Sequence, residues 1–437
     1  MRKSVITQGF SAPLRGEIKT PPDKSMSHRS LIIGSLTKGK IKISNFLTGA
    51  DCLATLEILK ELGCEIQFID ENTVVLDAKN AYRAPKKELY CGNSGTTMRL
   101  MAGLLSAQNF NSTLSGDISL SKRPMKRIIE PLSFMGAAIK SNDGKAPLVI
   151  EQANIKGIEY KSPIASAQVK SALLLAGLQT PNGKTTVLEP HLSRDHTERM
   201  LKFFGSNVEN YNKNGLFAAT ISQTPLMPKD LNVVGDISSA AFIMIAAAII
   251  KDSDVILKNI GLNPTRTGLI DVMKRMKANI DVLNCDLVSN EEVGDIRIKY
   301  SPDMEGCEIS GDLIPRLIDE IPVIALLASQ AKGETIIKDA GDLKNKESDR
   351  IACVERELRK FGVNIQGTED GFIIEGKNGG NGLFKGDLEV DCYHDHRIAM
   401  MGYIAGLISQ KPCKINDFEW VETSFPGFLN IFENLKK

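Results

Sequence analysis

The stretch KSMSHRSLIIGSL at Lys24–Leu36 has a polar start that runs directly into an apolar segment. Five further stretches repeat this order, with an apolar run rich in Gly, Ala, Leu and Ile: SGTTMRLMAGLLS at Ser94–Ser106, SAQVKSALLLAGL at Ser166–Leu178, ISSAAFIMIAAAII at Ile237–Ile250, DEIPVIALLAS at Asp319–Ser329 and HDHRIAMMGYIAGLI at His394–Ile408. Because the starts lie about 70 to 80 residues apart, we predict one supersecondary unit used six times.

Each apolar run predicts a helix that is buried on every side, because its hydrophobic residues do not keep to one face. The runs are too short, and too often broken by Gly and Ser, to span a membrane. A polar motif at the start of such a helix is a natural anion site, since free backbone N–H groups and the positive end of the helix dipole lie there. Six such starts therefore indicate a phosphate-rich site.

The composition of the 437-residue chain is that of a globular protein large enough for two domains. Its 54 basic and 53 acidic residues leave a net charge of +1, which argues against general binding of nucleic acid or anionic membranes. The eight cysteines show no C-x-x-C spacing and the first residues no secretory apolar core, so we expect free thiols in the cytoplasm. His394 and His396 have only carboxylates beside them, and no metal site is predicted.

Strand-like runs follow the buried helices, at Ile41–Phe46, Thr185–Leu188, Val255–Lys258 and Thr335–Lys338. Amphipathic helices come next, and four of them end on a shared pattern with Gly: LKELGCEI at Leu59–Ile66, LSFMGAAI at Leu132–Ile139, LKFFGSNV at Leu201–Val208 and LRKFGVNI at Leu358–Ile365. Glycine fits the positive φ that a helix C-terminus favours. A related segment, MKRMKANI at Met273–Ile280, keeps the spacing without the Gly. Further strands, as at Gly371–Glu375, complete an α/β repeat.

The six repeats divide naturally into three plus three. We predict a first domain at residues 19–231 and a second formed by residues 1–18 and 232–437, with the Pro-flanked segment Thr224–Asp230 near the boundary. The strand of the first repeat is expected near Glu17–Lys19, which leaves Met1–Arg15 to complete the last repeat.

Cations recur in the motifs at equivalent places of the repeats, and equivalent places should face a common cleft. The first motif holds Lys24, Ser25 and Arg29, and later ones hold Arg123, Arg194, Arg266, Arg350 and Arg397. Lysine offers a point charge and arginine a planar fork for phosphate or carboxylate. Gly95 lets the backbone approach a ligand closely. Asp319 as base, with Glu347 or Lys24 as proton donor, makes a workable acid–base pair.

These motifs resemble one family closely. PPDKSMSHR, GNSGTTMRL, SKRPM, SAQVKSALLLAGL, SRDHTE, GDISSAAF, LIDEIP, KESDR and DHRIAM, in this order from Pro21 to Met400, are similar to the EPSP synthase (3-phosphoshikimate 1-carboxyvinyltransferase) family of enolpyruvyl transferases. The resemblance implies two domains, each of three βαβαββ units with buried parallel helices, and an active site in the cleft between the domains. It also implies transfer of the enolpyruvyl group of phosphoenolpyruvate to the 5-hydroxyl of shikimate 3-phosphate by addition–elimination, in the shikimate pathway to chorismate and the aromatic amino acids.

The resemblance also implies the site residues. For shikimate 3-phosphate they are Lys24, Ser25, Arg29, Ser166, Ala167, Gln168, Ser193, Arg194, Asp319 and Lys346. For phosphoenolpyruvate they are Lys24, Gly95, Arg123, Arg350 and Arg397, and the catalytic residues are Asp319, Glu347 and Lys24. Ala167 stands where many relatives have Ser, which loses one hydroxyl contact. Thr423 stands where one branch has Lys, so no catalytic Lys is assigned in the tail.

The family resemblance implies a monomeric cytoplasmic enzyme without metal or organic cofactor, whose partners are its two small substrates. Glyphosate is expected to compete with phosphoenolpyruvate. Two alternatives stay open. A UDP-N-acetylglucosamine enolpyruvyl transferase usually has Cys in the loop that reads SLSKRPM here, yet no Cys lies between Cys91 and Cys285. A binding module that senses a phosphorylated metabolite has no use for the acid–base pair.

Overall fold

The computed structural model describes residues 3–79, 82–377 and 384–436, which form two compact units. The N-terminal unit comprises residues 22–234 and 287–291, and the C-terminal unit comprises residues 1–21, 235–286 and 292–437. The chain passes from one unit to the other at Pro21–Pro22 and at Val234–Gly235, and the short segment 287–291 also groups with the N-terminal unit.

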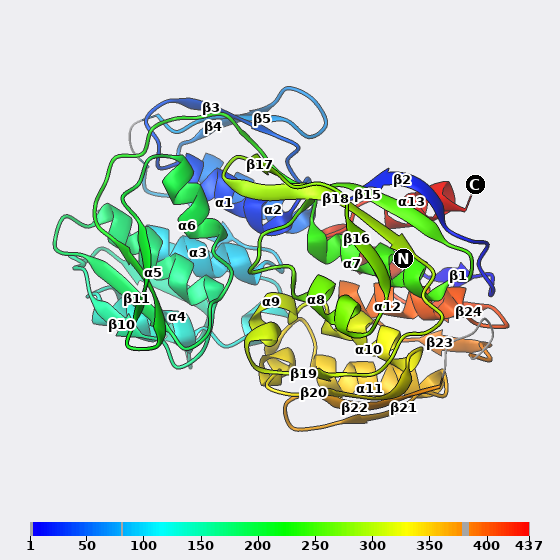
Figure 1. Ribbon diagram of the computed structural model, residues 1–437. Helices are drawn as coiled ribbons and strands as arrows, with labels where there is room; N and C mark the ends of the chain where they lie inside the picture. The colour runs from blue at the N-terminus through cyan, green and yellow to red at the C-terminus, as the bar shows by residue number, and fades with distance from the viewer. Residues whose placement is uncertain (1–2, 80–81, 378–383, 437) are drawn as a thin grey trace. The chain divides into compact units, whose positions relative to one another are not determined.

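The N-terminal unit holds three four-stranded sheets (Figure 1). In order across each sheet, the strands are β14 (Leu231–Asn232), β3 (Lys40–Ser44), β5 (Val74–Asp77) and β4 (Glu65–Phe68); β6 (Leu89–Tyr90), β7 (Ser112–Ser115), β9 (Lys145–Glu151) and β8 (Ala138–Asn142); and β10 (Glu159–Lys161), β11 (Thr185–Glu189), β13 (Leu216–Ile221) and β12 (Glu209–Lys213). The helices are α1 (Lys24–Gly34), α2 (Ala50–Glu61), α3 (Gly95–Leu105), α4 (Lys126–Phe134), α5 (Ala167–Gln179) and α6 (His196–Phe203), with a short 3₁₀ helix η1 (Leu120–Lys122).

The C-terminal unit repeats this plan. Its sheets are β16 (Asn279–Val282), β18 (Glu291–Lys299), β15 (Asp254–Gly261) and β2 (Arg15–Lys19), with β17 (Asp286–Val288) beside β18; β19 (Glu308–Ile309), β20 (Lys332–Ile337), β22 (Phe372–Lys377) and β21 (Asn364–Gly367); and β1 (Val5–Thr7), β24 (Cys413–Ile415) and β23 (Leu388–Val390). Its helices are α7 (Ile237–Ile249), α8 (Gly268–Arg275), α9 (Ile314–Leu317), α10 (Ile321–Ser329), α11 (Arg350–Lys360), α12 (His396–Leu407) and α13 (Phe428–Leu435). The 3₁₀ helices are η2 (Gly311–Leu313), η3 (Gly341–Asn345) and η4 (Phe418–Thr423).

All six sheets share one pairing rule. A short strand lies parallel to the strand that follows the buried helix, and the remaining strands of the repeat lie antiparallel. Figure 1 shows how α10 and α11 lie along one side of the sheet that contains β20 and β22. The predicted α/β repeat is confirmed, and in four of the six sheets the buried helix supplies the crossover that a parallel pair needs. In the sheets of β3 and β15 the parallel partner, β14 or β2, comes from elsewhere in the chain.

The six predicted buried helices are confirmed as α1, α3, α5, α7, α10 and α12. Every residue of α7 and of α10 is buried, and α7, α10 and α12 contact one another in the core of the C-terminal unit. In the N-terminal unit α3 packs tightly on α5. Gly103 permits this approach, since a Cβ there would lie 2.2 Å from the carbonyl oxygen of Ala172.

One strand lies in a different repeat from the one predicted. The sequence places Glu17–Lys19 in the first repeat, but β2 is parallel to β15 in the sheet of the fourth repeat. Two residues, Leu231–Asn232, take its place beside β3. The predicted completion of the last repeat is confirmed, because β1 is antiparallel to β24.

The glycines that end the amphipathic helices adopt positive φ as predicted: Gly63, Gly136, Gly205 and Gly362 have φ values of 105°, 100°, 89° and 82°. Lys277 occupies the corresponding place after α8 and also has a positive φ, 63°. Among the described residues, the helices are all shorter or more polar than a segment that crosses a membrane.

Candidate active site

The start of α1 carries the first predicted cations. Asp23 caps the helix by accepting a hydrogen bond from the Met26 amide at 2.7 Å. The Lys24 ammonium lies 2.7 Å from the Asp51 carboxylate in the first turn of α2, and its side chain is 22% exposed. Lys24 is thus held by an acidic residue that the motif did not reveal, yet it stays accessible to an anion.

Arg29 is buried in the second turn of α1. Its Nε donates to the Thr197 hydroxyl at 2.7 Å, and its Nη2 donates to the Ser171 hydroxyl at 3.0 Å. Its Nη1 donates to the carbonyl of Ser25 at 3.1 Å. Burial lowers the pKa of Arg29 to about 10, and the charge of Glu198 opposes this shift, so the guanidinium remains protonated at neutral pH.

Two guanidinium groups flank the start of α3. A Cβ on Gly95, the first residue of the helix, would lie 3.1 Å from Arg99 Nη1 and 3.4 Å from Arg123 Nη1. Arg123 follows η1 and donates to Asn93 Oδ1 at 2.6 Å. Two cations beside a helix N-terminus whose first residue has no side chain form a site suited to phosphate.

The start of α5 lies next to this group. Gln168 accepts a hydrogen bond from Arg99 at 2.6 Å and donates to the Thr96 hydroxyl at 3.0 Å. Ser166 caps α5, and Ser193 and Arg194 lie on the loop between β11 and α6. In the N-terminal unit, hydrogen bonds therefore connect the polar starts of α3 and α5, while Thr97 of α3 reaches the Asp51 carbonyl of α2 at 3.4 Å.

Within the C-terminal unit, Arg350 joins three carboxylates. It donates to Asp395 at 2.8 Å, to Glu347 at 2.6 Å and to Asp319 at 3.3 Å. Burial alone would lower the pKa of Arg350, but Asp395, Glu347 and Asp319 raise it above its ordinary value. Burial alone would raise the pKa of Asp395, but the charge of the neighbouring Arg350 keeps that pKa below its ordinary value. Both groups therefore stay ionised at neutral pH.

Asp319 has a second cation beside it, because Lys346 Nζ lies 3.1 Å from its carboxylate. Arg397, in the first turn of α12, donates to the Asp319 carbonyl and to the Ser238 hydroxyl, both at 2.7 Å. Glu320 lies 3.6 Å from Arg397 and also accepts a hydrogen bond from Ser238. The predicted Arg266 is buried and meets this group through Glu320, 3.9 Å away, while it also lies 3.6 Å from Asp236.

The structure thus places the predicted site residues in two groups. One lies in the N-terminal unit and contains Lys24, Ser25, Arg29, Gly95, Arg123, Ser166, Ala167, Gln168, Ser193 and Arg194. The other lies in the C-terminal unit, where contacts connect Asp319, Lys346, Glu347, Arg350 and Arg397. Sequence reasoning missed Asp51, Asn93, Arg99 and Asp395. Arg99 had a detectable signal, because it stands four residues after Gly95 and helical side chains point back toward the N-terminus.

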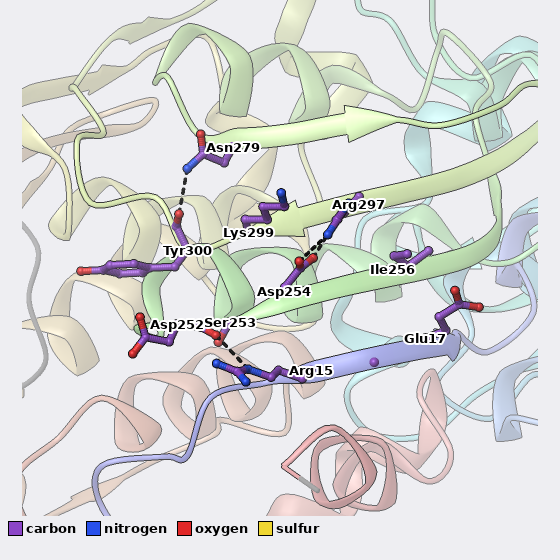
Figure 2. A pocket seen from close by; sticks show the side chains of 11 residues that line it. Arg15, Glu17, Asp252, Ser253, Asp254, Ile256, Asn279, Arg297, Lys299 and Tyr300 are labelled. Atoms are coloured by element: carbon purple, nitrogen blue, oxygen red, sulfur yellow. Dashed lines mark hydrogen bonds and ion pairs between the residues drawn. The ribbon is translucent and has the colours of Figure 1, made fainter.

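A separate pocket of about 640 Å³ lies over the sheet that contains β2, β15 and β18. Figure 2 shows Arg297 turned toward Asp254 there, with hydrogen bonds of 2.8 and 2.5 Å. The predicted site residues do not line this pocket. Within residues 3–79, 82–377 and 384–436, no cluster of three His, Cys, Asp or Glu side chains is placed to hold a metal ion.

A protein of six α/β repeats, with cations gathered at the starts of its buried helices, is built to bind small anionic molecules. The family model for EPSP synthase (3-phosphoshikimate 1-carboxyvinyltransferase) matches residues 10–432, and the chain belongs to this family. The match confirms the resemblance drawn from the motifs and identifies an enzyme family of the shikimate pathway.

Named relatives support the assignment. Proteins called 3-phosphoshikimate 1-carboxyvinyltransferase from Bacillus thuringiensis (strain Al Hakam) and Petrotoga mobilis are 49% and 48% identical, over 438 and 428 residues. The first match covers 100% of both chains and the second 97% of both. A solved structure of EPSP synthase from Acinetobacter baumannii superposes with a TM-score of 0.86 at 42% identity, covering 100% of this chain and 98% of that one.

Proposed function

We propose that this chain transfers the enolpyruvyl group of phosphoenolpyruvate to the 5-hydroxyl of shikimate 3-phosphate. The products are 5-enolpyruvylshikimate 3-phosphate and phosphate. Membership of the EPSP synthase family supports the reaction, and the group of Asp319, Lys346, Glu347 and Arg350 is the observation that carries the chemistry. The addition–elimination itself requires only acid–base groups and fixed cations, with no metal or organic cofactor.

Shikimate 3-phosphate is proposed to bind mainly through the N-terminal unit. The groups we assign are Lys24, Ser25, Arg29, Ser166, Ala167, Gln168, Ser193 and Arg194, together with Asp319 and Lys346 from the C-terminal unit. A charge-assisted hydrogen bond contributes about 1.5–3 kcal/mol, more than the ~0.3–1 kcal/mol of an exposed helix dipole. The cations therefore provide most of the binding energy, and the helix starts orient the phosphate.

Phosphoenolpyruvate is assigned to Lys24, Gly95, Arg123, Arg350 and Arg397. Arg123 is held by Asn93. Arg350 already makes four hydrogen bonds to carboxylates, which leaves one of its five N–H donors for a ligand. This fixed orientation supports a role in positioning the substrate carboxylate or phosphate, because preorganised donors cost no reorganisation during the reaction.

Asp319 is proposed to accept the proton of the 5-hydroxyl while C3 of phosphoenolpyruvate is protonated by Glu347 or Lys24. The hydroxyl oxygen then adds to C2 and gives a tetrahedral intermediate, from which phosphate leaves as C3 loses a proton. Lys346 and Arg350 lie 3.1 and 3.3 Å from the Asp319 carboxylate, so they hold the proposed base in one position before substrate binds.

Phosphate release tests the proposal directly. The purified chain is mixed with phosphoenolpyruvate and either shikimate 3-phosphate or UDP-N-acetylglucosamine. We expect release only with shikimate 3-phosphate; release only with the nucleotide sugar would overturn the substrate assignment, and binding without release would indicate a sensor.

Substituting the base separates enzyme from sensor. Asp319→Ala should lower kcat about 10²–10⁴-fold, while shikimate 3-phosphate still binds. Asp254→Ala is the matched control, since it also removes an Asp paired with an Arg in the C-terminal unit. Turnover unaffected by Asp319→Ala would contradict its role as base.

We also propose that the enzyme works in the cytoplasm as a monomer. All eight cysteines are free, as in a reducing compartment. Light scattering after size exclusion checks the oligomeric state, where a mass of 47.7 kDa is expected.

A further inference from the structure

Three ionisable side chains that the proposed chemistry does not use are buried together in the N-terminal unit. They are Lys170 of α5, Glu189 at the end of β11 and Glu198 of α6, with side chains 1–2% exposed. Lys170 Nζ lies 2.9 Å from Glu189 and 2.8 Å from Glu198, and it donates to the Ser193 carbonyl at 3.3 Å. An ammonium has three N–H groups, so Lys170 uses all of them to connect α5, β11, α6 and the loop between the last two.

Glu189 binds two groups that we assign to shikimate 3-phosphate recognition. Its Oε1 accepts from the Ser166 amide at 2.9 Å, just before α5 begins. Both of its oxygens lie 2.8 Å from the Ser193 hydroxyl. Since a hydroxyl has one proton, Ser193 can donate to a phosphate only by leaving Glu189. The carboxylate therefore determines where this hydroxyl lies before substrate arrives.

The same cluster borders Arg29. Thr197, the neighbour of Glu198 in α6, accepts the hydrogen bond from Arg29 Nε at 2.7 Å. Burial of three charged groups costs desolvation free energy. Well-packed apolar residues in place of a buried ion pair often make a protein equally or more stable. A cluster that contacts two assigned substrate-binding residues and lies next to a partner of a third is thus explained better by positioning than by stability.

We infer that Glu189, held by Lys170, is a positioning residue for shikimate 3-phosphate. It holds the start of α5 at Ser166 and the Ser193–Arg194 loop in fixed relative positions before the substrate arrives, so that only the Ser193 hydroxyl has to turn from Glu189 to the substrate phosphate. This inference rests on the proposed function.

The first test is Glu189→Gln. Glu189 accepts from Ser166 on one oxygen and from Lys170 on the other, so an amide in either orientation turns an N–H toward a donor. We expect the Kd and KM for shikimate 3-phosphate to rise about tenfold or more, as for loss of a charged hydrogen bond. The KM for phosphoenolpyruvate should stay within about twofold, a split that general loosening of the fold would not produce.

Two further variants keep the test decisive. Glu189→Asp keeps the charge that Lys170 requires but withdraws the carboxylate by one methylene, and it should show the same split if Glu189→Gln fails to fold. Ser193→Ala should add little to Glu189→Gln in a double-mutant cycle, because Glu189 acts on the substrate through the Ser193 hydroxyl. Additive effects would contradict this dependence.

Ser35→Ala is the matched control. It removes a buried hydroxyl that bonds Tyr82 and Ile32 at the far end of α1, and it should lower stability without changing either KM. Equal changes in both KM values for the Glu189 variants, or none, would overturn the inference while the proposed function stands. A wild-type chain that neither binds nor converts shikimate 3-phosphate would overturn both.

Discussion

Gly95 is the residue at which a single methyl group is expected to change ligand selectivity. A Cβ there would press on Arg99 Nη1 at 3.1 Å, and that nitrogen already donates to Gln168 at 2.6 Å. Gly95→Ala should therefore shift the guanidinium and narrow the proposed phosphoenolpyruvate site. Overpacking of about 1–3 kcal/mol predicts that the glyphosate inhibition constant rises about tenfold or more, with a smaller rise in the KM for phosphoenolpyruvate. Inhibition kinetics check this; equal losses for both ligands would rule the account out.

His28 predicts a pH dependence of stability. Burial, together with the charges of Lys24 and Arg29, lowers the pKa of His28 well below its ordinary value. Below about pH 6.5, His28 is therefore protonated in the unfolded chain but stays neutral in the folded protein. The free energy of unfolding should fall as pH is lowered through this range, by up to ~1.4 kcal/mol per pH unit from this group.

Urea unfolding between pH 7 and pH 5 measures this slope. His28→Asn should flatten it, whereas His394→Asn, a change at an exposed histidine, should leave it as in the wild type. An unchanged slope in His28→Asn would show that other groups account for the acid sensitivity.

Individual site residues differed in how well the sequence revealed them. Arg29 and Arg350 stand in motifs dense with polar residues, so they could be recognised. Lys170 lies inside an apolar run and Asp395 between two histidines, where their partners could not be read from neighbours in sequence. Glu189 meets Lys170 only because β11 and α5 are adjacent in the folded chain. Partners distant in sequence require the fold.

Helix ends are the element-scale feature that the sequence predicted best, and Lys277 is the exception to test. It stands at the positive-φ position after α8 where four other helices have Gly. The left-handed conformation destabilises the folded state by roughly 1–2 kcal/mol when the residue is not glycine. Replacement by glycine removes this strain, but glycine also loses more backbone entropy on folding, which offsets part of the gain. Lys277→Gly should therefore stabilise the protein by about 0.5–1 kcal/mol.

Its control separates backbone from charge. Lys277 also pairs with Glu305 at 2.6 Å, but both side chains are at least half exposed, so this pair contributes little. Lys277→Ala loses the pair and keeps the strained φ, and it should be no more stable than the wild type. A Gly variant no more stable than the Ala variant in urea unfolding would contradict the strain.

Across the whole molecule, the sequence revealed six repeats because buried helices and their polar starts recur locally. The exchange of β2 and β14 between repeats could not be predicted. β14 has only two residues, and parallel pairing joins strands far apart in the chain, so no local periodicity marks it. The exchange is nevertheless what places β2 with the C-terminal unit and β14 with the N-terminal unit.

Because the assigned cations are divided between the two units, we predict that a substitution in the C-terminal unit can abolish turnover while shikimate 3-phosphate still binds. Most groups assigned to shikimate 3-phosphate belong to the N-terminal unit, whereas Arg397 belongs to the C-terminal unit and is assigned to phosphoenolpyruvate alone. A ligand at about 100 times its Kd adds ~2.7 kcal/mol to the free energy of unfolding. The unfolding temperature should therefore rise by the same amount with shikimate 3-phosphate in the wild type and in Arg397→Ala, although the variant loses turnover.

Gln168→Ala should lose most of this rise in unfolding temperature, because Gln168 joins the starts of α3 and α5. A shift abolished by Arg397→Ala would mean that Arg397 also binds shikimate 3-phosphate, which would contradict its assignment to phosphoenolpyruvate alone.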